Sequence, residues 1–183
     1  MHKELELLRT SLPKQLQFLR TGLGWRGSYQ RLQKKIQNNP PRIVIFAGTA
    51  GQLNPTLTSG QVVFPEKWCF LDGRCYRQSS IVSEHLISCG FAPQGAGLTV
   101  KSPVFTKEKR SFLYQKTGAL ICDMESAGVL FQAQKLQIPA VAIKVVSDTA
   151  DSGISGYWND FNENLRLLGN YLGEVIKILS TSF

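Results

Sequence analysis

The sequence is short of charge and of long hydrophobic runs: 19% of its 183 residues are charged, and its apolar stretches are brief. None of them approaches the roughly 20 consecutive apolar residues of a membrane-spanning helix, which excludes an integral membrane protein. The first ten residues, MHKELELLRT, contain no uninterrupted apolar segment and no cleavage site of small residues, so they do not resemble a secretory signal. We therefore expect a cytoplasmic protein.

Cysteine and histidine are also scarce, with four and two residues, and no two cysteines form a Cys-x-x-Cys pair. Zinc sites need clustered nitrogen or sulfur ligands, so we expect no metal site and no cofactor. A cysteine protease is disfavoured, because neither histidine has a context that would activate a thiol. Without a secretory signal, reduced cysteines are expected. The residues concerned are Cys69, Cys75, Cys89 and Cys122, and His2 and His85.

Positive charge is unevenly distributed along the chain. The net charge is +8, of which residues 1–42 carry +7 and residues 43–183 only +1. The basic segment fits a solvated helix face best, and the alternative is an electrostatic surface for nucleic acid or an acidic partner. No RNA-binding or zinc-finger signature is present, so a nucleic-acid partner is disfavoured.

Apolar residues are plentiful at 43%, and their periodicity alternates between that of strands and that of helices. There is no repeat, linker or low-complexity stretch, so we predict one domain over residues 1–183. Strands separated by helices predict an α/β sheet that helices cover on both faces. We expect strands at residues 15–20, 42–47, 61–64, 97–100, 118–122 and 140–146, and helices at residues 3–10, 28–38, 80–89, 105–115, 124–136 and 160–179.

Small or polar residues follow three of the expected strands. They are Gly48–Gly51, after a strand ending at Ala47, then Asp123–Ser126, and then Ser147-Asp148. Ligands of open α/β sheets bind outside the carboxyl ends of strands, so we expect these segments to converge. The glycines would let the backbone approach a ligand.

Two carboxylates in these segments are candidate functional groups. Glu125 could accept hydrogen bonds from vicinal sugar hydroxyls, and the alternative is that Asp123 and Glu125 serve the start of a helix. Asp148, at the end of a buried strand, could act as a general acid, and the alternative is a loop or capping residue.

Taken together, these motifs carry a family resemblance. The sequence resembles the purine nucleoside phosphorylase/uridine phosphorylase superfamily, most closely its methylthioadenosine/S-adenosylhomocysteine nucleosidase branch. The resemblance begins at about residue 15 and runs to the C-terminus. It is carried by Gly48-Thr-Ala-Gly51, Cys122-Asp-Met-Glu-Ser126 and Lys144-Val-Val-Ser-Asp148-Thr-Ala-Asp151, and more weakly by Leu19-Arg-Thr-Gly22-Leu-Gly24.

The resemblance implies a fold, a reaction and site residues. The implied fold is a three-layer α/β/α sandwich around a mixed, twisted sheet. The implied reaction is cleavage of the glycosidic bond of a purine nucleoside, and the implied assembly is a homo-oligomer, with a dimer favoured. The resemblance also implies Asp148 as the catalytic acid at the base, Met124, Glu125, Thr49 and Ala50 at the ribose, Phe105 and Ser147 at the base, and Gly22 and Gly24 in a loop on the side of the nucleophile.

Three departures from the family pattern define the alternatives. Phosphorylases carry an arginine before the glycine motif, where this sequence has Ala47, so water is favoured over phosphate as the nucleophile. The family's opening strand and its acidic residue have no match, which implies an N-terminally shortened form, and Lys144 stands where nucleosidases often have arginine. We therefore expect a nucleosidase acting on an adenine-type nucleoside. The alternatives are a phosphate-dependent phosphorylase and a catalytically impaired nucleoside-binding protein.

Overall fold

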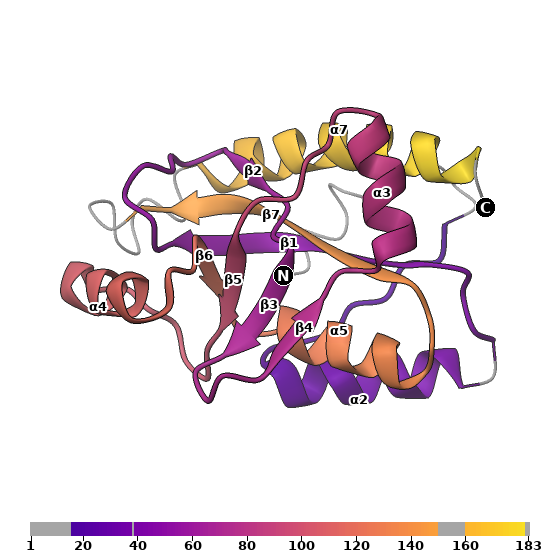
Figure 1. Ribbon diagram of the computed structural model, residues 1–183, viewed down its shortest axis with the longest axis horizontal. Coiled ribbons are helices and arrows are strands. Elements are labelled where there is room, and N and C mark those ends of the chain that lie inside the picture. Colours follow the sequence, from indigo (N-terminus) through magenta and orange to yellow (C-terminus); the bar gives the residue numbers. More distant parts are fainter. Residues whose placement is uncertain (1–15, 38, 150–159, 182–183) are drawn as a thin grey trace.

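The computed structural model describes residues 16–37, 39–149 and 160–181 (Figure 1). The helix expected at residues 3–10 lies outside these ranges. Among the described residues, no helix is both long enough and apolar enough to span a bilayer.

A mixed seven-stranded sheet forms the centre of the fold, with strand order β2-β7-β1-β6-β5-β3-β4. Its two longest strands, β1 and β7, are parallel and aligned from Val44 opposite Ala140 to Gly51 opposite Asp148. Every residue of β7 is buried, as expected for an apolar strand rich in β-branched residues at the centre of a sheet. The strands are β1 (Val44–Gln52), β2 (Val62–Val63), β3 (Lys67–Phe70), β4 (Cys75–Arg77), β5 (Ala96–Thr99), β6 (Ile121–Asp123) and β7 (Ala140–Asp148).

Helices cover both faces of this sheet, which confirms the expected three-layer α/β/α architecture (Figure 1). Alternate residues of β7 face opposite layers. Val141, Ile143 and Val145 pack with α3 and α7, whereas Ala140 and Ala142 pack with α5. The helices are α2 (Trp25–Ile36), α3 (Ser80–Ser88), α4 (Lys107–Thr117), α5 (Ser126–Lys135) and α7 (Phe161–Ser180).

Helix α2 lies directly against α5, and a glycine makes this close packing possible. A Cβ atom on Gly128 of α5 would stand 2.7 Å from the carbonyl oxygen of Trp25, the first residue of α2. The start of α2 is thereby fixed beside the segment that follows β6.

Two expectations about the first half of the chain are wrong. Gly48–Gly51 is not a loop after a strand ending at Ala47, because β1 continues through Gln52 and remains paired with β7. Residues 16–22 form no strand, although one was expected at residues 15–20; in the described part of the chain this segment joins no sheet. It instead lines a pocket beside β1.

The hairpin of β3 and β4 was not predicted, and it corrects the expectation of reduced cysteines. Cys69 and Cys75 face each other across the two antiparallel strands and form a disulfide. Adjacent strands bring directly opposed side chains to the separation a disulfide needs. Cys89 and Cys122 are free thiols.

Candidate functional site

Glu125 lies between β6 and α5, and its carboxylate binds the turn that precedes α2. Its Oε1 accepts the backbone N–H of Gly24 at 2.7 Å, and its Oε2 accepts that of Met124 at 3.3 Å. Burial raises the pKa of Glu125 above its usual value, and the neighbouring Asp123 charge raises it further. The carboxylate is therefore fixed in position, and its charged form is less favoured than that of an exposed glutamate.

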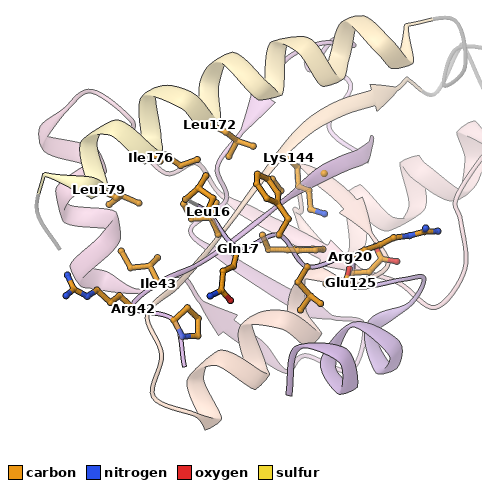
Figure 2. Close-up of a pocket in the computed structure, with 18 of the residues that line it drawn as sticks. Leu16, Gln17, Arg20, Arg42, Ile43, Glu125, Lys144, Leu172, Ile176 and Leu179 are labelled. Carbon is orange, nitrogen blue, oxygen red and sulfur yellow. The ribbon is translucent and has the colours of Figure 1, made fainter. Parts of the chain in front are cut away.

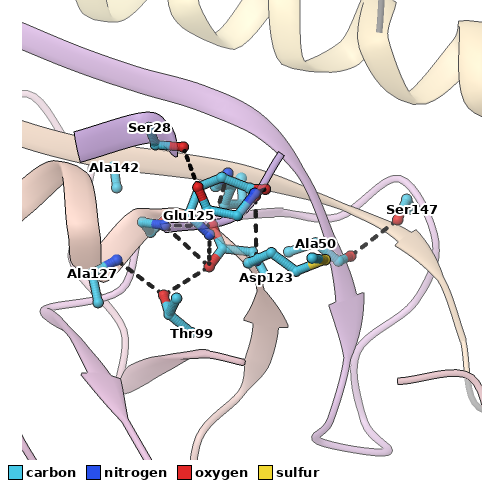
Figure 3. A network of polar contacts seen from close by, with 12 residues as sticks. Ser28, Ala50, Thr99, Asp123, Glu125, Ala127, Ala142 and Ser147 are labelled. Atoms are coloured by element: carbon cyan, nitrogen blue, oxygen red, sulfur yellow. Dashed lines mark hydrogen bonds and ion pairs between the residues drawn. The ribbon is translucent and has the colours of Figure 1, made fainter. Parts of the chain in front are cut away.

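Asp123, two residues earlier, anchors a buried polar network (Figure 3). Its carboxylate accepts the hydroxyl of Thr99 at 2.9 Å and the backbone N–H of Ser126 at 3.0 Å, so it caps the start of α5. It also pairs with the ammonium group of Lys144 at 3.0 Å, and both side chains are 2% exposed. Asp123 thus binds the first N–H of α5 from a position two residues before the N-cap residue Glu125, whose own side chain makes no capping hydrogen bond.

A pocket of about 770 Å³ opens beside β1, and Glu125 and Lys144 line one end of it (Figure 2). Thr49 and Gly22 line the same pocket. The Lys144 ammonium also lies 4.0 Å from the centre of the Phe46 ring, where the negative face of the ring attracts the cation. The other end of the pocket is mainly apolar, with Arg42 beside Ile43 (Figure 2). Its apolar lining residues are Leu16, Ile43, Leu172, Ile176 and Leu179.

A second polar group surrounds Asp148 at the end of β7. The hydroxyl of Ser147 donates to Asp148 Oδ1 at 2.6 Å and lies 3.2 Å from the carbonyl oxygen of Ala50. The guanidinium of Arg110, on α4, forms an ion pair with Asp148 Oδ2. Both Asp148 carboxylate oxygens therefore have partners, and the side chain is 7% exposed.

Strand direction sets the distance between the two groups. β6 runs antiparallel to β1, with Cys122 opposite Gly51, so Glu125 lies beside the middle of β1 and not at its carboxyl end. The expected convergence of three carboxyl ends is therefore wrong for this strand. Lys144 pairs with Gly48 of β1, and Asp148 pairs with Gly51. These two positions on β1 are three residues apart, which corresponds to about 10 Å along the strand.

Most of the site residues predicted from sequence fall into these two groups. Of the described residues, Glu125, Thr49 and Gly22 line the pocket, and Gly24 binds Glu125. Residues that do not line it include Ala50, Ser147 and Asp148, which are joined by hydrogen bonds at the end of β7.

Met124 and Phe105 belong to neither hydrogen-bonded group through their side chains. Met124 packs against an apolar cluster that includes Leu113 of α4, and Phe105 is 43% exposed just before α4. Both residues adjoin the site, because Met124 precedes Glu125 and Phe105 follows Val104, whose carbonyl accepts a hydrogen bond from Arg110.

Arg110 is the principal residue that sequence reasoning missed. It stands in the charged run Lys107–Arg110, which looks like a solvent-exposed face of a helix. The available signal was its spacing: Arg110 precedes the buried Leu113 by three residues, which places both on one face of α4. Among the described residues, no cluster of histidine, cysteine, aspartate and glutamate could hold a metal ion.

Comparisons with known proteins connect this architecture to one family. The family model for the phosphorylase superfamily matches residues 18–180. The 5′-methylthioadenosine/S-adenosylhomocysteine nucleosidase of Buchnera aphidicola from Acyrthosiphon pisum (strain Tuc7) is 26% identical over 163 residues, covering 76% of this chain and 68% of that protein.

Solved structures share the fold at low sequence identity. The Helicobacter pylori 5′-methylthioadenosine/S-adenosylhomocysteine nucleosidase with butyl-thio-DADMe-Immucillin-A has a TM-score of 0.86 at 14% identity, covering 97% of this chain and 94% of that one. The futalosine hydrolase of the same organism has a TM-score of 0.83 at 14% identity, with the same coverage of 97% and 94%. Such identities establish a common fold.

Proposed function

Because this chain belongs to the phosphorylase superfamily, we propose that it is a nucleosidase that hydrolyses the N-ribosidic bond of adenine nucleosides. Curated relatives named 5′-methylthioadenosine/S-adenosylhomocysteine nucleosidase support this choice of reaction and base. The observation that carries the proposal is the position of Glu125, a fixed carboxylate at the polar end of a pocket of about 770 Å³.

The reaction demands opposite charges at the two ends of the substrate. As the bond between C1′ and the purine nitrogen breaks, its electron pair stays with the base and positive charge develops on the ribose. Water then adds to C1′, and a proton is transferred to the base. An anionic group beside the sugar stabilises the first charge, and a proton donor or hydrogen-bonding group at the base stabilises the second.

Glu125 fits the sugar end of this scheme. A carboxylate offers about four lone-pair positions, and the Gly24 and Met124 amides occupy two of them. The remaining positions can accept the two vicinal hydroxyls of a ribose. Thr49 and Gly22, which line the same pocket, complete this end of the site.

Asp148 is assigned to the base end. Ser147 and Arg110 each occupy one position on its two carboxylate oxygens, so each oxygen retains a lone pair. The carboxylate can accept a hydrogen bond from the amino group or from a protonated ring nitrogen of adenine. A separation of about 10 Å along β1 between the levels of Lys144 and Asp148 is compatible with groups that contact opposite ends of one nucleoside.

The proposed reaction is tested by measuring base release. The purified protein is incubated with methylthioadenosine, adenosylhomocysteine, adenosine and inosine, with and without inorganic phosphate, and free bases are separated chromatographically. We expect adenine release from the first three substrates at the same rate with and without phosphate. Release only with phosphate would identify a phosphorylase. Binding of nucleosides without release from any of them would leave the impaired binding protein.

We also propose that the protein forms a homodimer. A cluster of aromatic rings in edge-to-face and stacked contact extends over α2, the β3–β4 hairpin and α5. Its side chains are half-buried, and they belong to Trp25, Tyr29, Phe70, Tyr76 and Phe131. Aromatic residues are enriched at protein interfaces. Leu71, at the tip of the hairpin, is 49% exposed. Light scattering should give a dimeric mass, and Leu71→Glu should lower it; a monomeric wild type would contradict the proposal.

A further inference from the structure

Arg110 is a fully buried cation that joins three segments around Asp148. Its Nε donates to the carbonyl of Val104 at 3.0 Å, and its Nη1 donates to the carbonyl of Gln52 at 3.1 Å. Nη1 also donates to the Asp148 carbonyl at 3.0 Å, and Nη2 pairs with the Asp148 carboxylate. Arg110 is 1% exposed, so these contacts replace its hydration.

The guanidinium is well suited to fix an orientation as well as to neutralise a charge. Its planar fork binds both the main chain and the side chain of Asp148, which restricts rotation of the carboxylate. The same Nη1 binds Gln52, at the end of β1, and thereby fixes Asp148 relative to the strand that carries Thr49. A lysine has a single ammonium group and cannot reproduce this set of contacts.

Stability alone is a weak explanation for this arrangement. Removing an arginine and an aspartate from water is expensive, and apolar residues of similar volume often stabilise such a position equally well. The geometry also contrasts with the pair of Arg166 and Glu163 on α7, where both side chains are more than half exposed. The two hydrogen bonds of that pair join side chains three residues apart on one helix and bind no other segment.

We propose that Arg110 is a positioning residue that holds the Asp148 carboxylate in the orientation that meets the departing base. The inference rests on the proposed nucleosidase function and adds to it a residue on α4 that the family motifs in this sequence do not include. Arg110 acts through Asp148 and does not touch the substrate. Misplacing a reacting group by about 1 Å can slow a reaction about 100-fold.

The test is a double-mutant cycle on adenine release from methylthioadenosine. It compares wild type, Arg110→Met, Asp148→Asn and the double variant, with Arg166→Met as a matched arginine control. We expect Arg110→Met to lower kcat by about 10- to 100-fold with little change in KM. In the Asp148→Asn background the same change should lower kcat no further, because the group that Arg110 positions is already disabled.

Arg110→Lys and circular dichroism separate positioning from folding. Arg110→Lys keeps the cation beside Asp148, and it should give a kcat between those of wild type and Arg110→Met. Equal kcat losses in both Asp148 backgrounds would show a general structural role and overturn the inference. A folded Arg110→Lys variant with the full kcat of wild type would also overturn it, because lysine cannot bind both the main chain and the side chain of Asp148. A wild-type protein that releases no adenine would instead overturn the proposed function itself.

Discussion

The backbone N–H of Gly24 donates to Glu125 Oε1 at 2.7 Å, which joins residues 101 positions apart in the sequence. Gly24 has a φ of 78°, a left-handed conformation that favours glycine, and α2 begins at the next residue. Ser28, one turn into α2, donates to the Gly24 carbonyl at 3.0 Å (Figure 3). The glycine turn and the Met-Glu motif are therefore one structural unit at the polar end of the pocket.

Glu125→Gln tests the ribose contact within that unit. Glutamine can still accept from Gly24, but it has lost the charge and one acceptor for the sugar hydroxyls. We expect kcat/KM for methylthioadenosine to fall by about 10- to 100-fold, the value of a hydrogen bond to a charged group. The 2′-deoxy analogue removes one hydroxyl from the substrate, so the loss caused by Glu125→Gln should be smaller with it. Equal losses with both substrates would contradict a ribose-binding role.

The pH dependence of stability reports on the raised pKa of Glu125. A group whose pKa is raised in the native state contributes stability below its unfolded pKa, and that contribution is lost as the pH rises through the native pKa. Glu125→Gln cannot ionise. The melting temperature of the variant minus that of wild type should therefore increase from about pH 4 to about pH 8.

Glu163→Gln provides the opposite control. The hydrogen bonds from Arg166 lower the pKa of Glu163, so its contribution to stability is present above the unfolded pKa and is lost as the pH falls. For this variant the difference in melting temperature should decrease over the same rise in pH. A Glu125→Gln difference that is flat, or that falls with pH, would refute the assigned shift.

The layers of the fold could be predicted from the sequence, but the positions of several segments could not. The apolar, β-branched run at residues 140–146 predicts the buried strand β7. The amphipathic spacing of apolar residues predicts α7. Residues 16–22 have the alternation of a strand, yet strand formation depends on a hydrogen-bonding partner that a local pattern does not reveal. The short strands β3 and β4 form as a hairpin around Asp72-Gly73, which was overlooked.

The site could be predicted as a set of residues but not as an arrangement. Motifs identified Glu125 and Asp148, and the structure places them in different hydrogen-bonded groups. The two residues lie in different groups because β6 runs antiparallel to β1. The direction of a strand depends on the whole sheet, so the local sequence around it does not reveal it. Arg110 was missed for a similar reason: its partners Gln52 and Asp148 lie 58 and 38 positions away.

Lys144→Met should destabilise the protein strongly. The ammonium of Lys144 pairs with Asp123 at 3.0 Å, and removing it leaves a buried carboxylate without its cation. Breaking a buried pair in this way costs about 3–5 kcal/mol, which urea denaturation would measure. Arg166→Met breaks an exposed pair and should change the unfolding free energy little. Similar losses in the two variants would show that Lys144 does not neutralise Asp123.

Thiol reactivity should separate the four cysteines into three classes. Cys89 is exposed and should react rapidly with a chromogenic disulfide reagent in the native protein. Burial raises the pKa of the Cys122 thiol to about 12, so it should react only after unfolding. Cys69 and Cys75 should react only after unfolding and reduction. Cys89→Ser should abolish the native reaction, and any remaining rapid reaction would show that the hairpin disulfide is absent.

Gly128→Ala tests whether helix packing supports the site from a distance. The added Cβ would stand 2.7 Å from the carbonyl oxygen of Trp25, which is backbone and cannot rotate away. The start of α2 must shift, and the Gly24 N–H would shift with it, away from Glu125. We expect a loss of about 1–3 kcal/mol in unfolding free energy from overpacking. We also expect kcat/KM to fall about tenfold, the lower end of the value of a hydrogen bond to a charged group.

Gly27→Ala is the matched control, because it makes the same change in α2, where the added Cβ would meet no side chain and no other segment within 4 Å. Replacing a helical glycine with alanine should stabilise the protein by up to about 1 kcal/mol and leave kcat/KM unchanged. If Gly128→Ala loses stability but keeps full activity, the contact between Gly24 and Glu125 is not needed for catalysis. If both variants lose activity equally, α2 affects the site through its own conformation and not through its packing on α5.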